Sequence, residues 1–253
     1  LFVPSTALCD PRDLLNSLRL RLLEDGVVFH EKEVHSVCPH EMGSITGATL
    51  FSDDEIVNAA GHGSLRIAQN SGVAKDLRSV PIRGRYLAHS EDSLKLRLPV
   101  YGLPSESNIT LGTHLTPSLD GGFKVGPSSE IGILKAMKLS LGLKGRNSWD
   151  ISWRMGSESL NGLGDKQLSK RRLLAEARML IPAVGELGDK AFDWAPGSYR
   201  PQLLNARKRE LLDDFILMTG GGGLHLLNII SPGWTSSLAL AKLAISKLRS
   251  KTP

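Results

Sequence analysis

The stretch from Leu224 to Leu248 constrains the fold of this chain more than any other, because it has the pattern of a complete strand–turn–helix unit. Leu224–Ile230 is mostly apolar and predicts a short strand. Ser231-Pro232-Gly233-Trp234 predicts a sharp turn, since Pro and Gly interrupt regular structure. The hydroxyl residues 235–237 are typical helix N-caps, and the residues that follow place an apolar side along a helix.

A helix that begins in this way presents unpaired backbone N–H groups and the positive end of its dipole. We therefore expect the turn before the helix to hold an anion, or a ring that becomes anionic during a reaction. The alternative stays open at this point, because every α/β protein contains strand–turn–helix units and this one could simply close the fold.

Composition narrows the classes of protein. The chain has 253 residues, 41% of them hydrophobic and 23% charged, which is enough to bury a sizeable core in one or two domains. Its net charge of +5 is mild, and aromatic residues make up only 5%, so the basic stripe with interleaved aromatics that marks nucleic-acid binding is missing. We expect no nucleic-acid partner. The positive balance would suit a dianionic substrate.

Cysteine content and hydropathy say little about the compartment. Cys9 and Cys38 are too few for a disulfide framework, which favours a reducing environment. We expect no membrane span, since no run of about 18 apolar residues occurs. We find no signal or transit peptide, but the chain starts at Leu1 and not at Met, so this does not locate the protein.

The order of predicted elements indicates an α/β start followed by an antiparallel sheet. Asp10 and Pro11 predict a helix start and Gly26 its end, and further segments predict strands at 27–29, 48–51 and 55–61 and a helix at 65–73. From residue 80 the pattern changes to strands at 81–87, 96–101 and 110–116 with a hairpin turn at 120–122. Residues 130–181 favour helix, and the glycines at 220–223 favour a flexible turn before the closing strand.

We therefore predict an α/β (α+β) fold in three parts. Residues 1–78 form part of an α/β domain, residues 79–195 form a domain with an antiparallel sheet and helices, and residues 196–253 return to the first domain.

Two motifs resemble known sites without matching them. His30 and His35 lie five residues apart, and a zinc-binding helix needs i, i+4 spacing; with Cys38 and His40 nearby a metal site is an alternative to solvated polar residues, and we predict none. Gly61-His62-Gly63-Ser64-Leu65-Arg66 departs from G-x-G-x-x-G at its last position, so we do not interpret it as a phosphate loop.

Several segments resemble one family, in family order. LLNIISPGWTSSLALA near the C-terminus resembles the closing motif of the FAD-dependent oxidoreductases of the D-amino-acid-oxidase superfamily. DEIVNAAGHGS resembles the family's second dinucleotide-contacting segment. VYGLP, LGTHLTPSLDG and VGP between residues 100 and 127 are similar to the L-2-hydroxyglutarate dehydrogenase/oxidase branch, as is the K/R-G-x-Y strand at 81–86.

The resemblance implies FAD as cofactor, and oxidation of a small 2-hydroxy acid, L-2-hydroxyglutarate, to 2-oxoglutarate by hydride transfer to the flavin. The residues that it places at the cofactor are Asn58, Ala59, Ala60, Gly61, His225, Asn228, Pro232, Gly233, Trp234, Thr235 and Ser236. The amides of residues 234–236 would stabilise negative charge on the reduced flavin. The electron acceptor, oxygen or a quinone or other electron-transfer partner, stays open. The resemblance implies a mitochondrial location if the source is eukaryotic and a cytoplasmic one otherwise.

The chemistry of this reaction selects four candidate residues. A neutral His is the usual base near pH 7, and His114 on a strand is our candidate, with a merely structural sheet histidine as the alternative. Arg200 is the expected carboxylate clamp, because a guanidinium pairs bidentately with a carboxylate. Arg83 and Tyr101 are secondary candidates for the other carboxylate.

One departure from the family pattern affects the expected cofactor binding and the expected activity. The family binds FAD with an N-terminal strand–GxGxxG–helix, which we do not find here, so we expect the chain to be the C-terminal part of such an enzyme, with an incomplete FAD-binding domain. Two alternatives follow: another member of the superfamily acting on an amino acid or a different hydroxy acid, or a truncated chain without activity that serves as a scaffold.

Overall fold

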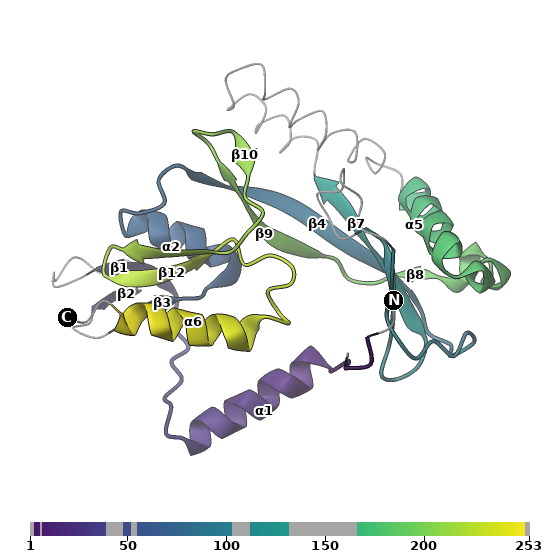
Figure 1. Ribbon diagram of the computed structural model, residues 1–253, viewed down its shortest axis with the longest axis horizontal. Coiled ribbons are helices and arrows are strands. Elements are labelled where there is room, and N and C mark those ends of the chain that lie inside the picture. Colours follow the sequence, from purple (N-terminus) through teal and green to yellow (C-terminus); the bar gives the residue numbers. More distant parts are fainter. Residues whose placement is uncertain are drawn as a thin grey trace. The chain divides into compact units, whose positions relative to one another are not determined.

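The computed structural model describes residues 3–5, 7–38, 48–51, 55–102, 112–131 and 166–250 (Figure 1). The chain forms two compact units. Unit 1 comprises Leu1–Glu31, Arg85–Ser128 and Lys166–Pro196, and unit 2 comprises Lys32–Gly84, residues 129–131 and Gly197–Pro253. The domain boundaries that we expect near residues 78 and 195 are a separate matter from these two compact units, and they stay a prediction.

Each described helix and strand lies wholly within unit 1 or unit 2, except for two long strands that the division crosses. Those of unit 1 are α1 (Pro11–Glu24), β5 (Val100–Tyr101), β6 (His114–Pro117), α5 (Lys166–Leu180), the 3-10 helices η2 (Pro182–Leu187) and η3 (Asp189–Ala191), and β8 (Asp193–Trp194). Those of unit 2 are β1 (Val34–Cys38), β2 (Ala48–Phe51), β3 (Val57–Asn58), η1 (Gly61–Gly63), α2 (Ser64–Asn70), β9 (Ser198–Asn205), β10 (Glu210–Leu211), β11 (Ile216–Gly220), β12 (Gly223–Leu227) and α6 (Ser237–Arg249). The division between the units crosses the two long strands β4 (Leu77–His89) and β7 (Phe123–Ile131).

The sheets confirm the expected mixture of α/β and antiparallel structure. The largest has the strand order β10-β9-β4-β7-β6-β5, with β8 also paired to β4. Its pairs β9–β10, β4–β9, β4–β8, β5–β6 and β6–β7 are antiparallel. In unit 2, β12 pairs in parallel with β3 and antiparallel with β11, and β1 pairs in parallel with β2.

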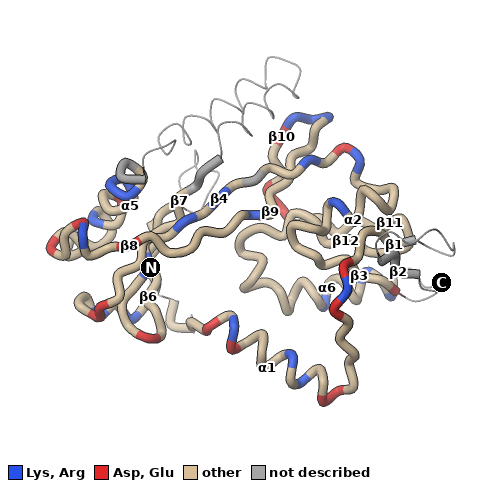
Figure 2. Tube along the Cα trace, turned by 180° about the vertical axis from the view of Figure 1, so that it is seen from behind, with Lys and Arg blue, Asp and Glu red and all other residues tan. Residues whose placement is uncertain are grey.

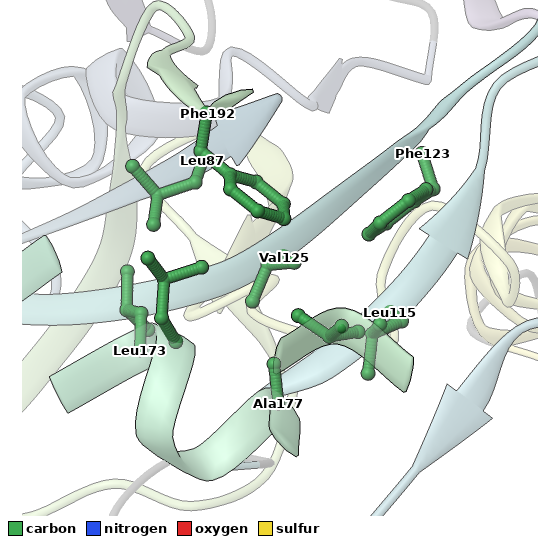
Figure 3. Close-up of a cluster of buried hydrophobic side chains, with 9 residues drawn as sticks. Leu87, Leu115, Phe123, Val125, Leu173, Ala177 and Phe192 are labelled. Atoms are coloured by element: carbon green, nitrogen blue, oxygen red, sulfur yellow. The ribbon is translucent and has the colours of Figure 1, made fainter. Parts of the chain in front are cut away.

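The core of unit 1 lies between α5 and the sheet. Figure 3 shows Leu173 and Ala177 of α5 directed toward the sheet residues Val125 and Leu115. The complete cluster consists of Leu87, Leu115, Phe123, Val125, Leu173, Leu174, Ala177, Val184 and Phe192. Burial of large aliphatic and aromatic side chains at this interface holds α5 on the sheet, because each contributes about 1.5–3 kcal/mol by transfer from water.

The central strand of unit 2 lies between two helices. Leu224 and Leu226 of β12 pack with Ala244 of α6, whereas Leu227 packs with Leu65 and Ala68 of α2. Successive residues of a strand face opposite sides, so β12 has α6 on one face and α2 on the other (Figure 1). This explains why β12 is buried along its whole length.

The ends of α1 agree with the sequence. Asp10 is the N-cap, its carboxylate accepts a 2.7 Å hydrogen bond from the amide of Arg12, and Pro11 begins the helix. Gly26 follows the helix with φ +82°, a conformation that suits glycine. The leucines of α1 form an apolar side as expected, but none of its residues is buried within the described chain.

Several predicted strands are shorter or displaced. The strand expected at 27–29 does not form; the Val27 amide instead caps α1 by donating to the Leu22 carbonyl at 2.9 Å, and Phe29 packs under the guanidinium of Arg19. Only 57–58 of the strand expected at 55–61 and only 100–101 of that at 96–101 are strand. Residues 130–131 extend β7 and are not helical, while residues 103–111 and 132–165 lie outside the described chain.

The four-glycine run forms a two-residue turn between β11 and β12. Gly221 and Gly222 have φ of +55° and +87°, the combination of a type I′ hairpin turn. A side chain on Gly221 would collide with the carbonyl oxygen of Ser71 at the end of α2. The turn was expected, but glycine is required there by backbone conformation and close packing.

Charged residues of both signs are spread along the chain (Figure 2). The basic turn between β9 and β10 is partly neutralised, because Arg207 pairs with Asp76 at 2.7 Å and Lys208 with Glu210 at 3.5 Å. Within the described residues, no helix has both the length and the apolar content needed to span a bilayer.

We expect Leu174→Ala to lower the free energy of unfolding by about 2–5 kcal/mol, because Leu174 is completely buried in the core of unit 1. Leu20→Ala is the matched control: Leu20 is 62% exposed on α1, so the change should stay within about 0.5 kcal/mol. Urea unfolding followed by circular dichroism would measure both. Equal effects of the two substitutions would contradict the assignment of this core.

Candidate functional site

Three motifs that are separate in the sequence meet in one transverse row of the unit 1 sheet. Tyr101 of β5 lies opposite His114 of β6, and His114 lies opposite Gly126 of β7. Tyr86 of β4 adds its ring to this row, 5.9 Å from the His114 ring in an edge-to-face arrangement. The register of the antiparallel sheet therefore gathers these side chains around His114.

His114 has the environment of a neutral imidazole. It is only 8% exposed, and the Tyr101 ring stacks on it with 4.7 Å between centroids. Burial lowers the pKa of His114 below its usual value, and a backbone hydrogen bond at Gly112 partly opposes this shift. Among the described residues, its Nδ1 atom is buried without a hydrogen-bond partner. A neutral ring with one unpaired nitrogen is equipped to accept a proton.

Gly126 is required for the Tyr86–His114 contact. A Cβ atom on Gly126 would lie 2.8 Å from Cδ1 of Tyr86 and 2.9 Å from the Arg85 carbonyl oxygen. Both distances are shorter than a normal contact, so any side chain here would displace the Tyr86 ring. This gives the VGP motif a physical reason, and it also shows that Tyr86, which we did not single out in the sequence, is part of the site. The K/R-G-x-Y pattern of its strand was the available signal.

The other side of β6 attaches this row to α5. The hydroxyl of Thr113 donates to Oε2 of Glu176, and Nε of Arg172 donates to Oε1 of the same carboxylate at 2.9 Å. Thr113 is itself buried. The residue beside His114 is thus joined to the helix by a charge-assisted hydrogen bond.

Arg83 and Arg200 do not project from the same face of their sheet. Both belong to unit 2, where Arg200 of β9 lies opposite Ile82 of β4 and Arg83 lies opposite Tyr199. Directly opposed residues share a face and successive residues alternate, so the two guanidinium groups start from opposite faces. Arg200 is half-buried and Arg83 is exposed. The two arginines are therefore not a pair of clamps on one side of the sheet, and their roles stay predictions.

The parallel pairing of β3 with β12 brings the two predicted cofactor segments to one edge of unit 2. Leu224 lies opposite Val57 and His225 opposite Asn58. The chain leaves β3 into Ala59, Ala60 and Gly61, and it leaves β12 toward the 231–236 turn. Carboxyl ends of parallel strands meet at the same edge, which is where α/β sheets bind ligands.

His225 is a buried, fully hydrogen-bonded imidazole. Nδ1 accepts from the Asn58 amide at 2.9 Å, and Nε2 donates to the Gly220 carbonyl at 3.1 Å. Asn58 also donates to the Ser64 carbonyl at 2.9 Å. Burial lowers the pKa of His225, opposed in part by the Gly220 bond. His225 and Asn58 thus join β3, β12 and the start of α2; their proximity to the flavin stays a prediction.

Asn228 has a comparable structural part just after β12. Its amide nitrogen donates to the carbonyls of Leu212 and Asp214, both at 2.8 Å, and its Oδ1 accepts from the Leu203 amide at 2.8 Å. It is 2% exposed and has φ +55°, which asparagine tolerates better than most residues. Asn228 thereby connects the end of β12 to β9 and to the segment before β11.

The turn before α6 offers fewer free amides than expected. The Ser236 amide donates to the Pro232 carbonyl at 3.0 Å, and the Gly233 amide donates to the Ile230 carbonyl at 2.5 Å. Within the described chain, the amides of Trp234 and Thr235 have no partner. The turn thus uses the Ser236 amide internally, whereas the Trp234 and Thr235 amides stay available as donors, and the contribution of all three to flavin binding stays a prediction.

The expected hydroxyl cap on α6 also does not form. Ser236 occupies the N-cap position, but its side chain makes no capping hydrogen bond. Its φ of −86° and ψ of −2° lie near the helical region, whereas a capping side chain normally comes from an extended residue. The Ser236 hydroxyl consequently satisfies none of the backbone donors at the start of α6.

The metal alternative rested on His30, His35, Cys38 and His40. No group of three His, Cys, Asp or Glu side chains that could hold a metal ion occurs among the residues the structure describes. His40 and the side chain of Cys38 lie outside them.

Comparison with known proteins is decisive for the family. Residues 1–246 match the family described as FAD dependent oxidoreductase (DAO). The chain belongs to this family. Its members depend on FAD, which agrees with the cofactor inferred from the LLNIISPGWTSSLALA segment.

Three relatives to which this chain is similar are named L-2-hydroxyglutarate dehydrogenase. L-2-hydroxyglutarate dehydrogenase, mitochondrial, of Caenorhabditis elegans is 28% identical over 228 residues, covering 83% of this chain and 51% of the relative. L-2-hydroxyglutarate dehydrogenase of Salmonella houtenae is 25% identical over 269 residues, covering 98% and 61%. The mitochondrial enzyme of Homo sapiens is 28% identical over 207 residues, covering 78% and 44%. The chain spans about half the length of the curated relatives that it matches.

The residues of unit 2 fit a flavin at the β3–β12 edge. The Trp234 and Thr235 amides are donors without a partner in the described chain, as a group that gains negative charge would require. Gly61 has φ +57° and open space around its Cβ position, so a bulky ligand could approach the backbone closely there.

We expect Gly126→Ala to destabilise the chain by about 1–3 kcal/mol, because the new methyl group collides with Tyr86 and the Arg85 backbone. It should also weaken the Tyr86–His114 ring contact, measured as a nuclear Overhauser effect. Gly185→Ala is the matched control in unit 1, since the nearest atoms would lie 3.8 Å away on the flexible Arg178 side chain. An unchanged Tyr86–His114 contact in Gly126→Ala would contradict this account.

We expect the chain to lose stability as the pH falls below about 6.5. The folded-state pKa of His225 is depressed by burial, so the unfolded state binds a proton that the native state refuses. The contribution is complete above the unfolded pKa of about 6.5 and falls by at most about 1.4 kcal/mol per pH unit below it. His225→Gln should reduce this slope in urea unfolding between pH 7 and 5, leaving the part due to His114. His30→Gln, at an exposed coil position, is the control; an unchanged slope in His225→Gln would contradict the assignment.

Proposed function

We propose that the protein to which this chain belongs oxidises L-2-hydroxyglutarate to 2-oxoglutarate with FAD as the electron acceptor. The observation that carries the proposal is His114, a buried histidine with a lowered pKa and a nitrogen without a partner in the described chain, set in the LGTHLT segment that resembles a motif of the L-2-hydroxyglutarate branch. The names of the relatives support the substrate.

The chain's own part in the reaction is to take a proton. The substrate's hydroxyl proton passes to Nδ1 of His114, the ring nitrogen that has no partner in the described chain. As the C–O bond becomes a carbonyl, the hydrogen on the same carbon leaves with its two electrons. FAD, when bound, supplies the acceptor for that electron pair. Burial serves this role, because it keeps the imidazole unprotonated at pH 7 and therefore able to accept a proton.

We propose that an arginine and a tyrosine bind the two carboxylates of the substrate. Arg200 is the proposed clamp for one carboxylate, since guanidinium and carboxylate form two parallel hydrogen bonds. Tyr101 is the first candidate for the other carboxylate, because its ring already stacks on His114 and is 56% exposed. Arg83 is the weaker candidate, since it projects from the face of β4 opposite to that of Arg200.

Two alternative functions make different predictions that experiments can distinguish. A different member of the superfamily would prefer an amino acid or a monocarboxylic hydroxy acid. A scaffold protein would retain no flavin. The acceptor that takes the electrons from the reduced flavin is oxygen, a quinone or a protein partner, and these three stay open. Because two of the relatives above are named as mitochondrial, we propose that location if the source is eukaryotic.

We expect His114→Gln to lower kcat/KM for L-2-hydroxyglutarate by about 10²–10⁴-fold in the FAD-loaded protein, the usual contribution of a general base. Flavin content, measured by absorbance, should be unchanged. His30→Gln is the control. Parallel assays with L-lactate and L-glutamate test the substrate class: faster turnover of either would favour the alternative oxidoreductase, full activity of His114→Gln would reject the base, and a protein without retained flavin or activity would favour the scaffold.

A further inference from the structure

The residue that precedes His114 is held in place by its side chain and not by the sheet. The β6 ladder begins at His114, which pairs with Tyr101 and Gly126, and the described pairing does not reach Thr113. Gly112 before it has φ +71°, a left-handed turn with no regular partner strand. The chain entering the His114 position therefore depends on other contacts for its placement.

Glu176 supplies that contact. Its Oε2 accepts the Thr113 hydroxyl, and its Oε1 accepts Nε of Arg172 at 2.9 Å. Arg172 lies one helical turn earlier on α5, so the carboxylate is oriented from within its own helix. Both oxygens are occupied, which leaves the Glu176 side chain a single preferred direction toward β6.

Alternation along β6 transmits this anchoring to the site. Thr113 and Leu115 face α5, where Leu115 belongs to the same buried cluster as Leu173 and Ala177 (Figure 3). His114, between them, faces Tyr101 and Tyr86 on the other side. Leu115 fixes the backbone just after His114 by core packing, and Thr113–Glu176 fixes it just before.

We propose that Glu176 is a positioning residue for His114, acting through the Thr113 hydroxyl, with Arg172 orienting the Glu176 carboxylate. This inference rests on the proposed function of His114 as the base. It assigns to α5 a part in catalysis beyond packing: the helix determines where the imidazole stands against the substrate. A displacement of that ring by about 1 Å is expected to cost up to about 10²-fold in rate.

The test compares four variants with one control. Thr113→Val keeps the shape and removes the hydroxyl, and Thr113→Ser keeps the hydroxyl. Glu176→Ala removes the acceptor, and Glu176→Gln keeps an acceptor oxygen without the charge. Glu186→Gln is the matched control, a carboxylate exposed on η2 of the same unit for which the described structure gives no ion pair.

The first readout needs no activity. In the chain labelled at histidine, NMR would follow the His114 ring resonances and titration, with thermal unfolding measured alongside. We expect Thr113→Val and Glu176→Ala to change the ring shifts and move the His114 titration toward that of a free imidazole, while Thr113→Ser and Glu186→Gln match the original. Unchanged His114 resonances in a folded Thr113→Val and Glu176→Ala would overturn the inference. So would a spread of changes over the whole unit 1 core, the mark of a structural role alone.

The second readout is kinetic, in the FAD-loaded protein. We expect Thr113→Val and Glu176→Ala to lower kcat by about 10-fold or more with KM changed by less than about 3-fold, and Thr113→Ser to recover most of kcat. Glu176→Gln should fall between the two. Full kcat in Thr113→Val while His114→Gln is inactive would reject the inference and leave the proposed function intact. Full activity in His114→Gln would instead reject the role of His114 as the base, on which this inference rests.

Discussion

The site in unit 1 depends on the register of a short antiparallel ladder. Pairing of β5 with β6 and of β6 with β7 sets Tyr101, His114 and Gly126 side by side. A slip of one residue would turn His114 toward α5 and place Leu115 in the polar row, because side chains alternate along a strand. The core under α5 prevents that slip, since Leu115 and Val125 are completely buried against it. Hydrophobic packing on one face therefore specifies the chemistry on the other.

Unit 2, in contrast, buries several polar side chains and supplies each of them with hydrogen-bond partners. Asn58, His225 and Asn228 are almost fully buried, and each has its polar atoms joined to backbone or to one another. An unsatisfied group of this kind would cost about 1–3 kcal/mol, so these networks specify the positions of β3, β9 and β12 tightly. They hold the edge at which the two segments proposed to bind FAD meet. The structure thus gives a structural task to residues that the sequence suggested as direct cofactor contacts.

Local signals in the sequence predicted elements well where one residue type has one physical meaning. Asp10, Pro11 and Gly26 marked both ends of α1, and Asp120-Gly121-Gly122 marked the hairpin between β6 and β7. The strand–turn–helix at the C-terminus formed as β12 and α6. Apolar runs were less reliable: Val27, Val28 and Phe29 favour a strand by composition, yet they follow a helix cap and find no strand partner among the described residues. A strand is decided by its neighbour, which composition does not name.

By itself the sequence determined the family, the cofactor and the candidate base, because LGTHLT and SPGWTSS are specific strings of residues that match the family without any knowledge of what lies near them in space. Only the tertiary structure decided which groups stand around that base. Tyr86 lies 28 residues before His114 and Glu176 lies 62 after it, and the sequence does not show that either one lies near the His114 position in space. The structure also showed that Arg83 and Arg200 start from opposite faces, and that the Ser236 amide is used within its turn. Pairing register and helix packing are long-range properties, set by how whole strands and helices share a core, and they are settled only when the chain has folded.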